Sequence, residues 1–242
     1  MAELSKFKHS EVINILKHNL RLTKINSNPD VDPDKTYLNY EIPIQQDSLT
    51  AYERYKKRKE EVYCYNRKDV NTLCSRIISA PKELEEEKDI KVFFENCVDF
   101  LKNRYGKENS ILAVVHRDEG VKIDKVDRWG NKIKDKDGNT ISEVVGRPHL
   151  HFNFIPITTK DKKHPGGKIC FNDVIPREEY RKFHPDLMNF LKSRNDKGAD
   201  YIVNGVTRRN GKNYSIKELK DKTKNQNAFT FENTKEVSKW ER

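Results

Sequence analysis

The segment between Pro148 and Pro156 constrains the fold of this chain more than any other. Its residues alternate, with one set made up of His149, His151 and Asn153 and the other of Leu150, Phe152 and Phe154. Because successive side chains of a β-strand point to opposite faces, the pattern predicts a strand with one apolar face and one face that carries both histidines. Two residues along a strand span about 6.6 Å, so both imidazoles can reach one ion at metal–nitrogen distances of about 2.1 Å.

A third histidine follows a second strand pattern. Residues 111–115 form a short, continuous apolar run, which predicts a buried central strand that ends at His116, with Asp118 and Glu119 directly after it. If the two strands are neighbours, three neutral imidazoles gather around open coordination positions, as in a catalytic metal site. Such an ion can stabilise the charge that grows on phosphate oxygens during in-line displacement. Ordinary core or surface histidines without a metal are the alternative at this point.

The charge balance narrows the class of partner. Lys and Arg number 48 against 38 Asp and Glu, a net charge of +10 that favours a polyanion such as nucleic acid, although a lysine-rich surface can also serve solubility alone. The four cysteines form no C-x-x-C pair, so neither a zinc finger nor a redox motif is supported. No apolar run approaches the roughly 18 residues of a membrane span, and no signal peptide is evident, so we expect a cytoplasmic protein.

The chain as a whole predicts an α+β fold. We expect a central, mostly antiparallel sheet that carries the histidines, with helices packed on one face and a groove on the other. Helices are predicted over residues 10–20, 51–59, 83–105 and 177–194, the last interrupted at Pro185, and strands over 37–44, 73–80, 111–115 and 148–156. We assign residues 1–220 to one domain with a hairpin or loop insertion at about 120–147, and residues 221–242 to a polar tail. No internal repeat is evident.

Several segments, in this order, resemble a known family. They are His18-Asn19-Leu20-Arg21 with residues 26–32 and Asn39-Tyr40, then residues 79–84, then Tyr105-Gly106 leading to His116-Arg117-Asp118-Glu119, and then Pro148-His149-Leu150-His151-Phe152 with Pro156 behind it. The set resembles the Mob/Pre plasmid mobilisation and recombination proteins, the MobV-type relaxases of the HUH endonuclease superfamily. The resemblance covers residues 18 to about 156 and weakens towards 220.

The resemblance implies a site- and strand-specific DNA nickase and strand transferase at a plasmid or integrative-element origin of transfer. Mn²⁺ or Mg²⁺ would be held by His116, His149 and His151. His18 would attack the DNA and become covalently bound to the 5′ phosphate, Arg21 would stabilise phosphate charge, and Glu119 would accept the proton. A neutral imidazole is a good nucleophile towards phosphorus, although the dipole at a helix C-terminus favours the charged form, which burial or the nearby cation must oppose.

The same resemblance implies the partners. The substrate would be single-stranded or supercoiled DNA at an origin of transfer. The resemblance also allows a coupling protein or other transfer proteins as partners. The residues that would contact DNA are Arg21, Lys24, Asn26, Asn28, Tyr40, Arg117 and Arg147.

Other interpretations stay open at this level. Tyrosine is the usual nucleophile of the wider HUH group, so Tyr37 and Tyr40 are alternatives to His18, and Tyr180 would suit a rolling-circle replication initiator. A non-catalytic basic DNA-binding module is the alternative outside enzymes. The insertion at 120–147 departs from the family pattern. Its basic residues and Trp129 either contact DNA or form a solvated hairpin.

Overall fold

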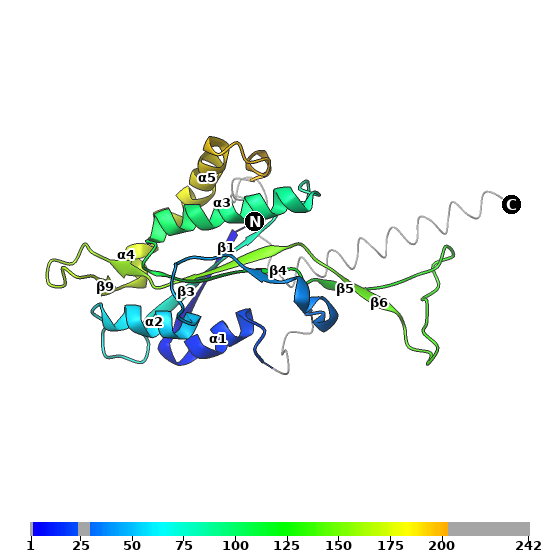
Figure 1. Cartoon of the computed structure of the whole chain (residues 1–242), viewed down its shortest axis with the longest axis horizontal. Coiled ribbons are helices and arrows are strands. Elements are labelled where there is room, and N and C mark those ends of the chain that lie inside the picture. The colour runs from blue at the N-terminus through cyan, green and yellow to red at the C-terminus, as the bar shows by residue number, and fades with distance from the viewer. Residues whose placement is uncertain (1, 24–29, 203–242) are drawn as a thin grey trace. The chain divides into compact units, whose positions relative to one another are not determined.

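The fold is built on a five-stranded sheet with strand order β1-β3-β7-β4-β2 and antiparallel pairing throughout. The computed structural model describes residues 2–23 and 30–202 (Figure 1). The strands are Ala2–Lys8 (β1), Tyr40–Glu41 (β2), Asn71–Ser79 (β3), Ser110–His116 (β4) and His149–Phe154 (β7). The predicted α+β class with a mostly antiparallel sheet is confirmed.

The central strand β7 fixes the register of the histidines. It pairs with β4 so that His149 lies opposite His116, and His151 lies opposite Val114. On its other side β7 pairs with β3, where His151 lies opposite Ile77. Because side chains alternate along each strand, all three histidines share one face of the sheet.

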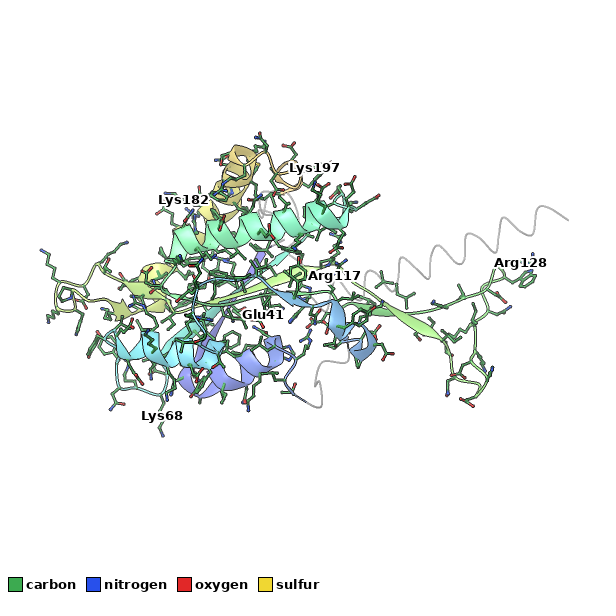
Figure 2. The ribbon with its side chains drawn as sticks, in the orientation of Figure 1. Glu41, Lys68, Arg117, Arg128, Lys182 and Lys197 are labelled. Carbon is green, nitrogen blue, oxygen red and sulfur yellow. The ribbon has the colours of Figure 1, made fainter. Side chains whose placement is uncertain are left out.

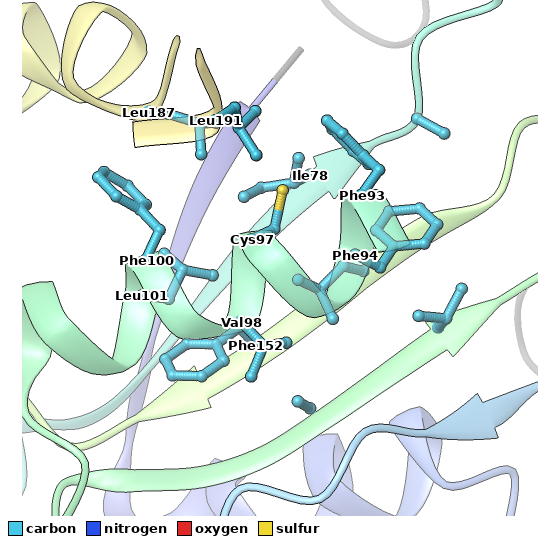
Figure 3. Close-up of a cluster of buried hydrophobic side chains, with 14 of the residues drawn as sticks. Ile78, Phe93, Phe94, Cys97, Val98, Phe100, Leu101, Phe152, Leu187 and Leu191 are labelled. Carbon is cyan, nitrogen blue, oxygen red and sulfur yellow. The ribbon is translucent and has the colours of Figure 1, made fainter. Parts of the chain in front are cut away.

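The opposite face is covered by α3 (Glu87–Tyr105) and α5 (Arg177–Ser193). The apolar stripe of α3 packs against Leu150, Phe152 and Phe154, and α5 closes the layer (Figure 3). Each fully buried side chain of this size contributes roughly 1.5–3 kcal/mol. Gly106, with φ +94°, ends α3 as predicted. The predicted interruption near Pro185 is wrong, because α5 runs through this proline.

The histidine face is partly covered as well. A short turn, His9–Glu11, leads into α1 (Val12–Asn19), which lies beside α2 (Ala51–Glu60) on this face (Figure 1). Val12, Leu16 and Tyr55 are buried there against Leu73 and other strand residues. The expectation of helices on one face is therefore incomplete, because α1 has an apolar stripe that needs a partner.

The predicted strand over 37–44 is mostly wrong. A 3-10 helix, Pro33–Leu38, replaces its first part, and only Tyr40–Glu41 pairs with β4. The side chain of Asp32 accepts a hydrogen bond from the Asp34 amide at 3.2 Å and caps this helix, and Pro33 fits its first turn. The remaining elements of this part are β8 (Ile157–Thr158), β9 (Lys168–Ile169), α4 (Phe171–Val174) and a 3-10 turn, Ala199–Tyr201. No helix of the described residues has the length and apolar character to cross a membrane.

Two compact units divide the chain. One holds residues 1–119 and 146–205, and the other holds 120–145 together with residues beyond the described range. In the second unit, β5 (Val121–Asp124) pairs with β6 (Ser142–Val145). Between them an eight-residue spacing recurs, which the sequence analysis missed: Asp127 and Asp135 each accept hydrogen bonds from the backbone amides two and four residues later. The predicted tail at 221–242 lies outside the described residues.

Candidate metal centre

The histidines meet at one end of the β4–β7 pair. Ring centroids are 4.5 Å apart for His116 and His151, 5.0 Å for His149 and His151, and 5.5 Å for His116 and His149. Glu119 joins them, and one ligand atom from each of the four residues lies within 4.8 Å of the other three. Ligands on opposite sides of an ion at about 2.2 Å are about 4.4 Å apart, so small inward movements would complete a coordination sphere.

The hydrogen bonds of these rings fit a metal-binding role. Nε2 of His116 donates to the Asn19 carbonyl at 2.7 Å, which fixes the tautomer and leaves the Nδ1 lone pair towards the cluster. Histidine ligands of metals are usually held by such a bond at the second nitrogen. Nε2 of His151 is buried and has no hydrogen-bond partner among the residues that the structure describes. Burial first and then neighbouring imidazoles lower the pKa of this ring well below its ordinary value. A neutral ring with an unused nitrogen is the form that binds a cation.

Glu119 brings a negative charge to the cluster. One of its oxygens lies 3.4 Å from Nδ1 of His116, and the other lies 3.6 Å from Nε2 of His149. Burial alone would raise the pKa of this carboxyl, but the two imidazoles and the Arg21 guanidinium hold it well below its usual range. Three nitrogen donors and one carboxylate suit a divalent transition metal such as Mn²⁺.

Arg21 connects α1 to the loop that follows β4. Its Nε and Nη2 donate to the two oxygens of Asp118 at 2.9 and 2.8 Å, and Nη2 also contacts Glu119 and donates to Nδ1 of His116 at 3.1 Å. Its Nη1 donates to the carbonyl of His18 at 3.1 Å. The side chain is only 5% exposed, and Asp118 is fully buried. This guanidinium is therefore a buried tie between two segments that are far apart in sequence.

The backbone conformation of Arg21 is part of the same arrangement. Its φ of +54° lies in the left-handed region, which a residue with a Cβ adopts at a cost of roughly 1–2 kcal/mol. This conformation ends α1 and turns the side chain into the loop contacts. Asp118 receives further hydrogen bonds, from Thr36 Oγ1 at 3.0 Å to its side chain and from the Asp32 amide at 2.7 Å to its carbonyl. The hydrogen bonds of Asp118 offset the cost of the left-handed backbone at Arg21.

His18 lies in the last turn of α1, next to this network. Burial is the largest influence on the ring and lowers its pKa, the positive charge of Arg21 lowers it further, and Glu119 opposes both. The net direction favours a neutral imidazole. Burial and a nearby cation therefore oppose the effect of the helix dipole at this position.

The other predicted site residues are placed differently. Arg117 contacts Glu87 through its side chain. Tyr40 has a buried hydroxyl that meets no hydrogen-bond partner within the described part of the chain, and burial raises its pKa to about 12. Arg147 is exposed, and its carbonyl lies 3.1 Å from Nδ1 of His149. Three predicted DNA contacts lie outside the described residues: Lys24, Asn26 and Asn28.

Sequence reasoning did not find every residue that shapes the cluster. Asn19 is fully buried, and its side-chain amide donates to Asn153 of β7 at 2.9 Å while its carbonyl holds His116. The alternation in β7 had already placed Asn153 on the histidine face, which was the available signal. Glu119 as a fourth donor could not be recognised, because its approach to His149 depends on the path of the loop.

The chain matches a family model described as "Plasmid recombination enzyme" (Mob_Pre) over residues 1–221. Similar curated proteins carry the same description. One from Bacillus thuringiensis is 29% identical over 81% of this chain and 37% of its own length, and one from Lactiplantibacillus plantarum is 27% identical over 91% of this chain and 52% of its own length. The chain thus spans about half or less of the length of these relatives.

A solved structure has a similar fold. It is described as the MobM relaxase domain (MOBV; Mob_Pre) bound to plasmid pMV158 oriT DNA in a Mn-bound crystal. The TM-score is 0.64 with 23% identity, and the match covers 91% of this chain and 97% of that one. A second crystal of the same domain gives a TM-score of 0.63 with 22% identity.

Proposed function

Since the chain belongs to the Mob_Pre family of plasmid recombination enzymes, we propose that it is a relaxase that nicks and transfers one DNA strand at an origin of transfer. We assign the activity to residues 1–220, with residues 120–147 as an insertion. Its substrate would be supercoiled or single-stranded plasmid or integrative-element DNA, and its partners would include the other proteins of DNA transfer.

One observation carries this proposal. Four donors, three imidazoles and the Glu119 carboxylate, converge within 4.8 Å beside the helix end that presents His18. Mn²⁺ or Mg²⁺ held by His116, His149, His151 and Glu119 would supply Lewis acidity to a phosphate oxygen.

His18 acts as the nucleophile in this proposal. A ring nitrogen uses its lone pair to form a bond to phosphorus, the bond from phosphorus to the 3′ oxygen breaks, and that oxygen leaves as a hydroxyl after it takes up a proton. The proton that the imidazole loses balances the one that the leaving 3′ oxygen takes up, so the adduct is a phosphoramidate to the 5′ phosphate. The lowered pKa of His18 supports the role, because only the neutral ring has the lone pair.

Arg21 and Glu119 contribute charge beside the reacting groups. Arg21 supplies a permanent positive charge next to the phosphate, and its ties to Asp118 hold it in place. The family resemblance implies that Glu119 accepts the proton. Its strongly lowered pKa makes the carboxylate a weak base, which favours the role of metal donor.

The tyrosine alternatives receive less support from their positions. Tyr180 lies on α5, which packs against the face of the sheet opposite the histidines. Tyr37 is 81% exposed on the 3-10 helix, and the hydroxyl of Tyr40 is buried. A buried hydroxyl whose pKa is raised to about 12 is a poor source of a phenolate nucleophile.

Nicking of a supercoiled origin plasmid tests metal, reaction and nucleophile together. We expect nicked DNA and a covalent protein–DNA adduct with Mn²⁺ or Mg²⁺ and neither product with a chelator. His18→Ala should abolish the adduct, whereas Tyr180→Phe, the matched control for a tyrosine nucleophile, should retain it. Mass spectrometry of the adduct identifies the modified residue. DNA binding that ignores chelators and yields no nicked product would instead identify a non-catalytic binding module, and an undiminished adduct in His18→Ala would refute the nucleophile.

A further inference from the structure

A cavity at the other end of α1 has no role in the metal site. Its volume is about 530 Å³, and it is lined by His9, Tyr52, Lys56, Lys59, Glu60, Val62, Tyr63 and Cys64. His9 precedes α1 and His18 lies in its last turn, so these two residues are roughly 14 Å apart along the helix axis at a rise of about 1.5 Å per residue. Volumes of this size are typical of sites for small organic groups.

One wall of the cavity is an exposed aromatic ring on a fixed support. Tyr63 is 40% exposed, and its ring stacks on His164 with centroids 3.7 Å apart and planes 19° apart. The backbone of Tyr63 donates to the Gly167 carbonyl at 3.0 Å and accepts from the Ile169 amide at 2.9 Å. His164 is itself held by Asp161 at 3.1 Å. A ring held this firmly is a platform on which a nucleobase can stack with little loss of side-chain freedom.

Two lysines line the cavity from α2. Lys56 and Lys59 are three residues apart and so lie on the same side of the helix. Within the part of the chain that the structure describes, no carboxylate lies within 4.0 Å of either ammonium group. Burial first and then the charge of Lys59 lower the pKa of His9, which indicates that this ammonium lies near the cavity. Lys68, in the loop beyond Tyr65, adds a further outward positive charge (Figure 2).

His9, which lines the cavity, is held in place by buried polar contacts. Nδ1 of His9 is hydrogen-bonded to the hydroxyl of Tyr55 at 2.9 Å, and that hydroxyl is bonded to Oγ1 of Thr72 at 2.7 Å. Tyr55 is fully buried and stacks with Tyr52 at a centroid distance of 6.2 Å. These contacts join α2, the turn before α1 and β3, so the shape of the cavity is fixed by the core.

We propose that this cavity binds a nucleotide of single-stranded DNA away from the scissile phosphate, with its base on Tyr63 and neighbouring phosphates at Lys56 and Lys59. The inference rests on the proposed function, because the same DNA strand would occupy the metal centre. Aromatic platforms beside lysines are the combination that binds single strands, since every base has a π-face and every linkage has a charge. A second contact at this distance would hold the strand while the metal centre acts on it.

The test uses origin oligonucleotides that extend stepwise on either side of the nick, with Mn²⁺ present and the full chain. Oligonucleotides that reach the cavity should bind the wild type more tightly, and Tyr63→Ala should weaken this binding about tenfold, the effect of one lost base stack. Lys56→Ala/Lys59→Ala should lower the slope of log affinity against log salt by about 1.4, because each phosphate contact with a single strand contributes about 0.7. The wild type, Tyr63→Ala and the double lysine variant should all cut the shortest cleavable oligonucleotide equally.

Lys88→Ala/Lys91→Ala is the matched control, because these exposed lysines have the same spacing on α3, which covers the opposite face. Equal changes in slope for the two double variants, or changes that do not depend on oligonucleotide length, would overturn the inference. If the wild type cuts no oligonucleotide at all, the proposed function fails instead. A thiol probe gives a readout without substitution: long oligonucleotides should protect Cys64, which lines the cavity, but not Cys170, and equal labelling with and without DNA would count against the site.

Discussion

Replacement of Arg21 is the sharpest test of how the site is held together. Arg21→Ala removes all the hydrogen bonds that the guanidinium makes to Asp118, Glu119 and the His18 carbonyl. The carboxylate of Asp118 is fully buried, so it would lose its cation without gaining water. Loss of one partner of a buried ion pair costs about 3–5 kcal/mol in the free energy of unfolding. We expect the variant to lose an amount in this range.

A glycine variant separates the side chain from the backbone. Arg21 has a φ of +54°, which glycine adopts freely and alanine does not. Arg21→Gly loses the same hydrogen bonds as Arg21→Ala but escapes the left-handed strain of roughly 1–2 kcal/mol. It should therefore be more stable than the alanine variant by about 1 kcal/mol.

The ion pair itself is isolated by a double-mutant cycle. Asp118→Ala leaves the guanidinium with Glu119 as its remaining carboxylate, whereas the double variant with Arg21→Ala leaves neither member of the pair buried alone. The double variant should lose less free energy of unfolding than the two single variants lose together, by about 2 kcal/mol. Urea unfolding in a chelating buffer measures all four proteins without a contribution from bound metal. Single losses that add to within about 0.5 kcal/mol would refute a coupled buried pair.

Three further predictions follow from other contacts. Glu119→Gln should weaken Mn²⁺ binding, measured by calorimetry, by about 10–100-fold. The same change at the exposed Glu41 (Figure 2) should leave Mn²⁺ binding unaltered. His184 has a pKa lowered from 6.5 mainly by burial, so the unfolded chain takes up its proton first and stability falls as pH drops through 6.5. His184→Gln should flatten this dependence in urea unfolding, and an unchanged slope would contradict it. Gly106→Ala, at φ +94° with a side-chain amide 2.5 Å from the added Cβ, should cost roughly 1–3 kcal/mol, while Gly166→Ala, with open space around it, should be nearly neutral in the same assay.

The predictions that succeeded from sequence came from local repetition. The alternation in β7 and the apolar spacing in α3 follow from the geometry of one strand and one helix, so each could be read within a few residues. The prediction failed where a cap or a packing contact competed with the local pattern. Asp32 and Pro33 start a 3-10 helix where a strand was predicted, and α5 passes through Pro185 because its apolar stripe stays packed against α3.

The edge of the sheet could not be predicted for a related reason. Ala2–Lys8 forms β1, whose mixed residues give no clear alternation, and it becomes a strand through seven paired positions on β3. Edge strands face solvent along one side, so their sequences carry less hydrophobic pattern than central strands do. Pairing with β3 therefore decides the structure of this segment.

By itself, the sequence determined that two histidines share a strand face and that a third ends a second apolar run, because side-chain direction is set by backbone geometry alone. Only the tertiary structure decided that Glu119 faces this cluster, that the Asn19 carbonyl fixes His116, and that Arg21 is buried against Asp118. The contacts of Asn19 and Arg21 join residues 97 positions apart. Their geometry depends on sheet register, on the left-handed turn at Arg21 and on the packing of α1, which no local pattern contains.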